Sequence, residues 1–110
     1  MITGPGSPSV LAVVVVAIEQ HVDWVAQCID YMRANGLDSI EAQPAAENAW
    51  AMHVNDVAQA TLMPRANSWY MGANIPGKPR MFMPYVGGLG VYRQKCDEVA
   101  QAGYTGFTLH

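Results

Sequence analysis

The side chains best suited to chemistry in this sequence are three histidines and one pair of carboxylates. His21, His53 and His110 lie far apart along the chain. A metal site needs several ligands around one ion, and isolated histidines are more often hydrogen-bonded or solvated. Glu19 and Asp23 are four residues apart, so both carboxylates share one helix face, where they could serve acid–base chemistry or face solvent. From these residues we expect no metal centre and no catalytic group.

A second candidate is the glycine-rich opening, residues 4–9, which reads Gly-Pro-Gly-Ser-Pro-Ser. It matches the start of a dinucleotide fingerprint, G-x-G-x-x-S, but lacks the third glycine. Its two prolines also remove amide N–H groups where phosphate-binding donors are needed. The motif therefore predicts a tight turn and no phosphate cradle.

The most informative stretch is residues 65–79, RANSWYMGANIPGKP, which predicts a long loop. Loops of about 12–15 residues without structure of their own are uncommon and often functional. Trp69 offers an apolar ring and one N–H donor, which suits stacking on a heterocycle or bonding to a ribose. The alternative is that Trp69 packs the loop onto the body of the protein.

Periodicity and turn residues predict a mainly helical α/β piece. The long helix covers residues 10–35, with Ser7 or Ser9 as its cap, although the β-branched run 13–16 also favours a strand. The first half of this helix is apolar all round and must be buried on every side. Its later half has one apolar face, formed by Ile18, Val22, Val25, Cys28 or Ile29, and Met32.

Downstream of Gly36 the elements are shorter, and the long loop interrupts them. A helix over 45–62 ends at Pro64, and a shorter helix covers 91–102. Trp24 and Trp50 lie on helix faces and are expected in the core. The extended pieces are 39–42 (a strand or a linker), 81–86 and 105–109.

Composition excludes several classes of protein. With 110 residues, the chain is one domain at most, because independent domains run to about 100–200 residues. Hydrophobic residues make up 51 % and charged residues 14 %, which excludes disorder. A net charge of −3 argues against a nucleic-acid binder. The longest apolar run, residues 10–18, is far shorter than the roughly 20 residues needed to cross a membrane.

The charge distribution and the cysteines bear on the ligands and the cellular compartment of the chain. The balance is −6 over residues 1–64 (one basic, seven acidic) and +3 over residues 65–110 (five basic, two acidic). The basic part could face an anionic ligand such as a phosphate, or the asymmetry could be chance. Cys28 and Cys96 form no paired motif, which indicates a reducing compartment, and we expect a cytoplasmic location.

The run 67–80, NSWYMGANIPGKPR, closely resembles the C-terminal portion of Baeyer–Villiger monooxygenases. Other stretches agree in the same order, and together they cover essentially the whole chain. They are ITGPGSPS at 2–9, IEQHVDW at 18–24, MPYV at 83–86, YRQKCDEVA at 92–100 and GYTGF at 103–107. The similarity is nearest the phenylacetone and cyclohexanone monooxygenase branch.

The resemblance implies that residues 1–110 are the C-terminal segment of a Rossmann-type FAD-binding domain. Such enzymes use FAD, NADPH and O2 to insert oxygen beside a ketone, giving an ester or lactone. The glycine fingerprints, the family signature and the catalytic arginine belong to earlier parts of the family chain. We therefore expect the isolated chain to be inactive, and to bind neither FAD nor NADPH tightly.

The resemblance also assigns residues to sites by position. The turn that approaches the flavin corresponds to Gly4, Gly6 and Ser7. The bulge that lines the ketone pocket corresponds to Ser9, Val10 and Leu11. The mobile-loop tryptophan that bonds the nicotinamide ribose of NADPH corresponds to Trp69. Relatives carry a methionine beside the flavin where this chain has Val14.

Two other functions stay open at this point. One is a stand-alone binding or interaction module that keeps the fold without activity. The other is an N- or S-oxygenating flavin enzyme on the same framework. The apolar run of the first helix also predicts that the isolated chain self-associates or is only loosely folded, because little charge opposes contact between copies.

Overall fold

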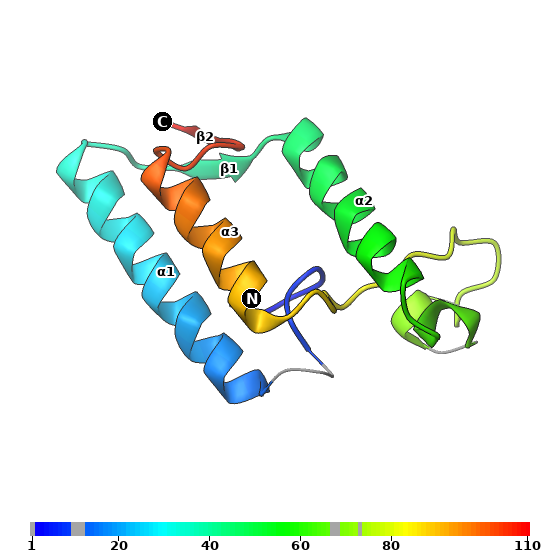
Figure 1. The fold of residues 1–110 in the computed structure, drawn as a ribbon. Helices are drawn as coiled ribbons and strands as arrows, with labels where there is room; N and C mark the ends of the chain where they lie inside the picture. Colours follow the sequence, from blue (N-terminus) through cyan, green and yellow to red (C-terminus); the bar gives the residue numbers. More distant parts are fainter. Residues whose placement is uncertain (1, 10–12, 67–68, 73) are drawn as a thin grey trace.

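The structure, a computed structural model, describes residues 2–9, 13–66, 69–72 and 74–110. These residues form a helix-rich piece with three α-helices, two short 3-10 helices and a two-stranded sheet (Figure 1). The elements, in chain order, are α1 (Val14–Ala34), β1 (Ile40–Ala42), α2 (Pro44–Gln59), η1 (Met63–Arg65), η2 (Trp69–Met71), α3 (Leu89–Gln101) and β2 (Phe107–Leu109). The expected long helix, second helix and mainly helical character are confirmed.

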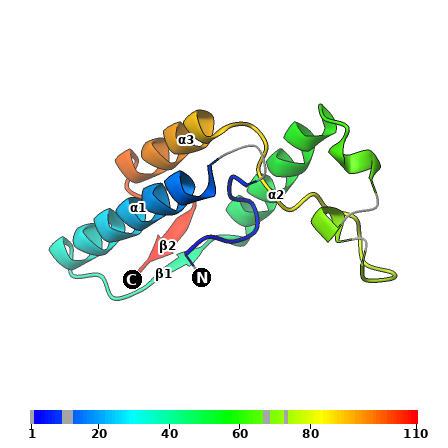
Figure 2. The same cartoon turned by 90° about the horizontal axis from the view of Figure 1, so that it is seen from below.

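Helices α1 and α3 lie side by side, as both views show (Figures 1 and 2). The indole Nε1–H of Trp24 on α1 donates to the backbone carbonyl of Cys96 on α3 at 2.9 Å. One turn earlier, the ring of His21 meets Tyr92 edge to face, with centroids 5.4 Å apart. Contacts from two turns of each helix thus fix the pair.

The sheet joins distant parts of the chain. Strands β1 and β2 are antiparallel, and Ile40, Glu41 and Ala42 pair with Leu109, Thr108 and Phe107 respectively. Both extended pieces expected there are therefore strands. The turn between α3 and β2 places Tyr104 at a φ of 61°, unusual for a residue with a side chain. Its buried ring packs on Trp24 at 5.2 Å, which holds this conformation in place.

Residues 81–86 are extended but do not form the strand that the sequence predicts. Their backbone hydrogen bonds go to two different segments. The Met83 N–H donates to the Tyr70 carbonyl in η2, and the Tyr85 N–H donates to the Ser7 carbonyl in the N-terminal turn. An isolated bridge joins Pro8 and Tyr85. The prediction is wrong because, within the described ranges, residues 81–86 bond to two separate turns and no strand runs alongside them to build a ladder.

The helix ends also differ from expectation. Helix α1 begins at Val14, after Val13, and no side chain caps it. The Ser7 hydroxyl donates to the Gly4 carbonyl instead, so the predicted serine cap is wrong for Ser7. Residues 14–16 are helical, which excludes the strand alternative there. Helix α2 ends at Gln59, well before Pro64, which instead lies inside η1.

The predicted core face of α1 is largely wrong. The residues it buries are Ala17, Gln20, His21 and Cys28. Ala17 lies in the half expected to be buried all round and Cys28 on the expected face, whereas the burial of Gln20 and His21 was not predicted. Ile18, Val22, Val25 and Ile29 each expose about two fifths of their surface. Val13 and Val15 expose about two thirds, although an all-round apolar helix half is expected to be buried. An apolar stripe thus lies open beside the contact with α3.

The dimensions of the chain agree with this open surface. Its radius of gyration is 15.2 Å. A compact domain of this length would have about 13 Å. The accessible surface is 7276 Å2. Folded monomers of this mass expose about 5,900 Å2. The fold therefore leaves more of its surface in water than a self-contained domain of this size does.

Trp50 on α2 holds the N-terminal turn against the rest of the chain. Its indole Nε1–H donates to the Gly6 carbonyl at 3.1 Å, and its ring stacks on Tyr85 at 5.2 Å. Gly6 has a φ of +81°, and a Cβ at this position would come within 2.8 Å of Trp50 Nε1. Glycine is thus required both for the backbone conformation and for the close approach of the indole.

We predict that Gly6→Ala lowers the free energy of unfolding by at least about 2 kcal/mol, since it combines backbone strain of about 1 kcal/mol with displacement of Trp50. Gly36→Ala is the control, because Gly36 also has a positive φ, +66°, but open space around it. That variant is expected to lose only about 1 kcal/mol. Urea unfolding followed by circular dichroism measures both. Equal losses would contradict the role of the indole contact.

Candidate functional site

The two segments assigned to cofactors meet at one residue, Met83. Its carbonyl accepts a hydrogen bond from the Gly6 N–H at 2.7 Å, and its N–H donates to the Tyr70 carbonyl at 2.9 Å. The glycine turn and the tryptophan of the long loop are thus tied to the same short stretch of backbone. The sequence does not reveal this link, because residue 83 carries no distinguishing side-chain chemistry.

The turn at residues 4–9 is held in shape by hydrogen bonds between its own residues. The Gly4 carbonyl accepts bonds from the N–H and the hydroxyl of Ser7, and Ser7 is 8 % exposed. The Gly6 N–H is bonded to Met83 and its carbonyl to Trp50. The amide donors of Gly6 and Ser7 are therefore already used. A ring that lies against this turn would contact it by packing.

The residues expected to line a substrate pocket are only partly described. Ser9 is half-buried at the end of the turn. Val10 and Leu11 lie outside the described residues. Their assignment to the pocket stays a prediction.

Trp69 lies on the surface, at the start of η2. Its side chain is 65 % exposed, and its ring centroid is 4.1 Å from that of Tyr70. Two residues later Met71 is 4 % exposed and packs with Ala58 of α2 and with Phe82. The loop is therefore anchored by Met71 and presents Trp69 outward. This arrangement favours the ligand-contact interpretation of Trp69 over the interpretation that it packs the loop onto the body.

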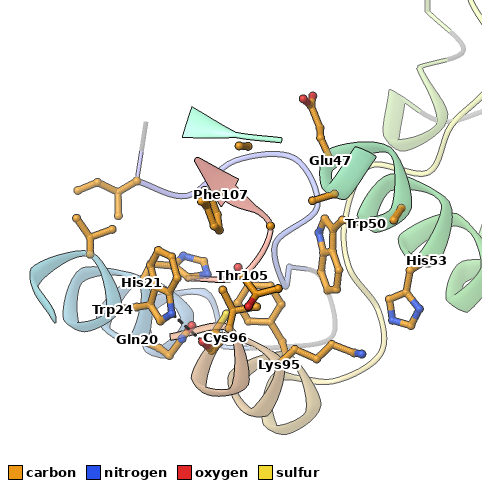
Figure 3. Close-up of a pocket in the computed structure, with 18 residues that line it drawn as sticks. Gln20, His21, Trp24, Glu47, Trp50, His53, Lys95, Cys96, Thr105 and Phe107 are labelled. Atoms are coloured by element: carbon orange, nitrogen blue, oxygen red, sulfur yellow. Dashed lines mark hydrogen bonds between the residues drawn. The ribbon is translucent and has the colours of Figure 1, made fainter. Parts of the chain in front are cut away.

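A cavity of about 710 Å3 lies between α1, α2 and α3 (Figure 3). Trp24 and Trp50 were expected in the core, but both are half-buried and line this cavity. Gln20 and His21, which sequence reasoning did not place in any site, line it from α1. The only signal was the polar pair Gln20-His21 in a helix otherwise rich in apolar residues.

His21 is the buried titratable group of this cavity. It is 6 % exposed, and its Nδ1 lies 2.9 Å from the hydroxyl oxygen of Thr3. Burial lowers the pKa of His21 below its ordinary value, because the charged form loses its hydration. Burial likewise raises the pKa of the Cys96 thiol and of the Tyr92 hydroxyl nearby. All three groups are therefore neutral at pH 7.

The other candidate carboxylates and thiols do not come together in a site among the described residues. Glu19 and Asp23 are exposed on α1, and both cysteines are free thiols. Among the described residues, no three His, Cys, Asp or Glu side chains lie close enough to hold a metal ion. In the same residues, no helix is both long and apolar enough to cross a membrane.

Known proteins share both the sequence and the fold. The chain is 45 % identical over 92 residues to an acetone monooxygenase (methyl acetate-forming) of Gordonia sp. (strain TY-5), covering 84 % of this chain and 17 % of that protein. It is 40 % identical over 105 residues to a Baeyer–Villiger monooxygenase of Pseudooceanicola batsensis, covering 96 % and 19 %. No model of a protein family matches the chain.

Among solved structures, an oxidized steroid monooxygenase bound to NADP superposes with a TM-score of 0.87 and 51 % identity. The match covers 97 % of this chain and 20 % of that one. The sequence and the fold thus place the chain among the flavin monooxygenases. Within this class it belongs to the Baeyer–Villiger family. The chain spans about one fifth of the length of the relatives it matches.

The burial of His21 predicts how stability changes with pH. Because its pKa is lowered in the folded state, the unfolded chain binds a proton more readily below pH 6.5, the ordinary value. Stability is therefore retained above this pH and falls as the pH decreases below it. We expect the melting temperature to fall more steeply between about pH 7 and about pH 5 in the native chain than in His21→Gln. Parallel pH profiles for the two chains would contradict this.

Proposed function

We propose that this chain is the C-terminal segment of the FAD domain of a Baeyer–Villiger monooxygenase that converts ketones to esters or lactones with NADPH and O2. The observation that carries the proposal is the combination of 45 % identity to an acetone monooxygenase and a TM-score of 0.87 to a steroid monooxygenase. The two matches cover 84 % and 97 % of this chain respectively. The Rossmann character of the complete domain and the cytoplasmic location are parts of the same proposal.

The segment's own contribution is to position the cofactors and the substrate. A flavin bound to the complete enzyme would supply the oxygen-transfer chemistry. The turn at residues 4–9 offers a rigid surface against the flavin, because its own hydrogen bonds and the Trp50 indole fix its shape. Ser9 would begin the wall of the ketone pocket, and Val10 and Leu11 would continue it.

Trp69 is proposed to contact the nicotinamide ribose of NADPH. Its exposed indole offers an N–H donor and an apolar face, which suit a ribose hydroxyl and the adjoining ring. The loop also carries Arg65 and Lys78, both exposed, which add positive charge for an anionic cofactor. Neither the turn nor the loop is a phosphate-binding glycine motif, so cofactor affinity must come mainly from other parts of the enzyme.

The proposal is tested by exchanging the matching segment of the Gordonia acetone monooxygenase for residues 1–110. We expect the chimera to bind FAD and to convert acetone to methyl acetate with NADPH. A chimera that folds and binds FAD but oxidises NADPH without forming ester would contradict the proposal. In that case the segment completes the fold without shaping the ketone site.

In this chimera, Trp69→Ala is expected to slow flavin reduction by NADPH roughly tenfold, since one hydrogen bond and a stacking contact are lost. The melting temperature is expected to stay nearly unchanged, because the side chain is 65 % exposed. Ile75→Ala is the matched control, since Ile75 is exposed in the same loop and has no proposed role. Normal reduction combined with a large fall in melting temperature would indicate a packing role for Trp69.

The open apolar stripe of α1 leads us to propose that the isolated chain self-associates. Burial of apolar surface is worth roughly 25 cal/mol per Å2, and Val13 and Val15 are both highly exposed. Replacing both valines by lysine is expected to convert an associating chain to a monomer in light scattering. Gln27→Lys with Ala34→Lys adds the same charge at exposed positions of α1 and is expected to leave association largely intact. A monomeric native chain with a sharp melt would contradict the proposal.

A further inference from the structure

The half-buried Tyr70 contacts the exposed Trp69 on one side and packs against buried side chains on the other. Its ring centroid is 4.1 Å from that of Trp69 and 6.3 Å from that of Phe82. Phe82 is 2 % exposed, and the buried cluster to which it belongs packs against Tyr70. A continuous set of side-chain contacts therefore leads from the core to the exposed indole.

The backbone that carries this aromatic pair is fixed by hydrogen bonds. The Tyr70 carbonyl accepts a bond from the Met83 N–H at 2.9 Å. The next carbonyl, that of Met71, accepts one from the Met81 N–H at 3.2 Å. Both bonds tie the pair to the extended residues 81–86. The position of the Trp69 indole therefore depends mainly on its own two side-chain torsions.

The Tyr70 ring restricts these torsions. The two ring planes are inclined by 32°, and at a centroid distance of 4.1 Å the rings lie face toward face. Tyr70 thus covers part of one face of the indole, while 65 % of the Trp69 surface stays exposed. A ligand can reach the rest of the indole, which Tyr70 keeps in a limited range of orientations.

Restriction of this kind favours binding. A side chain that is ordered before a ligand arrives does not lose that freedom on binding, so the affinity is higher. The indole has a single N–H donor with a fixed direction in the ring plane, so its bond to a ribose hydroxyl requires one orientation of the ring.

We propose that Tyr70 is a positioning residue for NADPH, whose ring restricts the orientation of the Trp69 indole before the cofactor binds. This inference rests on the proposed contact between Trp69 and the nicotinamide ribose. Tyr70 acts through Trp69, and it is the ring of Tyr70 that is needed.

The geometry is tested on the 110-residue chain by 1H–15N spectra of the indole N–H groups, in the variant with Val13→Lys and Val15→Lys to reduce association. Trp69→Phe identifies the Trp69 signal. Tyr70→Leu removes the neighbouring ring, so it is expected to shift this signal and leave the two other indole signals in place. Tyr70→Phe keeps the ring and is expected to leave the Trp69 signal near its original position. An unchanged Trp69 signal in Tyr70→Leu would overturn the proposal.

The function is tested in the acetone monooxygenase chimera, by the rate of flavin reduction at NADPH concentrations below saturation. Tyr70→Leu is expected to slow reduction roughly fivefold, and Tyr70→Phe to retain the native rate. Added to Trp69→Ala, Tyr70→Leu is expected to cause no further loss, because it acts only through the indole. Met63→Ala is the matched control, since Met63 packs against the same buried cluster. It is expected to lower the melting temperature without slowing reduction.

The outcomes separate this inference from the proposed function. Normal reduction in Trp69→Ala would show that the proposed NADPH contact is wrong, and the inference would fail with it. If Trp69→Ala slows reduction but Tyr70→Leu does not, or if the two losses multiply in the double variant, only the inference is overturned. Equal losses in Tyr70→Phe and Tyr70→Leu, or in Met63→Ala and Tyr70→Leu, would also contradict it.

Discussion

The indole of Trp50 joins three parts of the chain that are far apart in sequence. Trp50 belongs to α2. Its indole N–H donates to the Gly6 carbonyl of the N-terminal turn, and its ring stacks on Tyr85. The missing side chain at Gly6 is what allows this approach. Once the turn is fixed, the Gly6 N–H reaches Met83, and Met83 in turn holds the loop at Tyr70. The geometry of both proposed cofactor contacts therefore depends on one half-buried hydrogen bond, from Trp50 to Gly6.

Hydrogen bonds and aromatic contacts join the elements of the chain, but much apolar surface stays exposed. Helices α1 and α3 pack through Trp24 and His21, and the sheet and turns are closed by backbone bonds. The apolar stripe of α1 nevertheless remains in water, and the accessible surface exceeds that of a compact monomer. A segment that spans about one fifth of its relatives has this character if its apolar face is covered by another part of a larger domain.

Trp69 and the cavity between the helices differ in physical type. Trp69 is an exposed aromatic ring on a loop anchored by the buried Met71, an arrangement that presents a contact without contributing to the core. The cavity is lined by the half-buried rings of Trp24 and Trp50 from two helices. The exposed ring of Trp69 can clamp a ligand that is held mainly by other residues.

The sequence by itself determined the local elements and the family. Helical periodicity and turn residues predicted α1 and α2, because helix formation depends on residues three or four apart. Tertiary structure alone decided which face of α1 is buried. It also decided that residues 81–86 pair with turns on two sides, and that Gln20 and His21 line a cavity with Trp50. These features depend on partners ten or more residues distant or on an uncovered surface, and neither leaves a local pattern in the sequence.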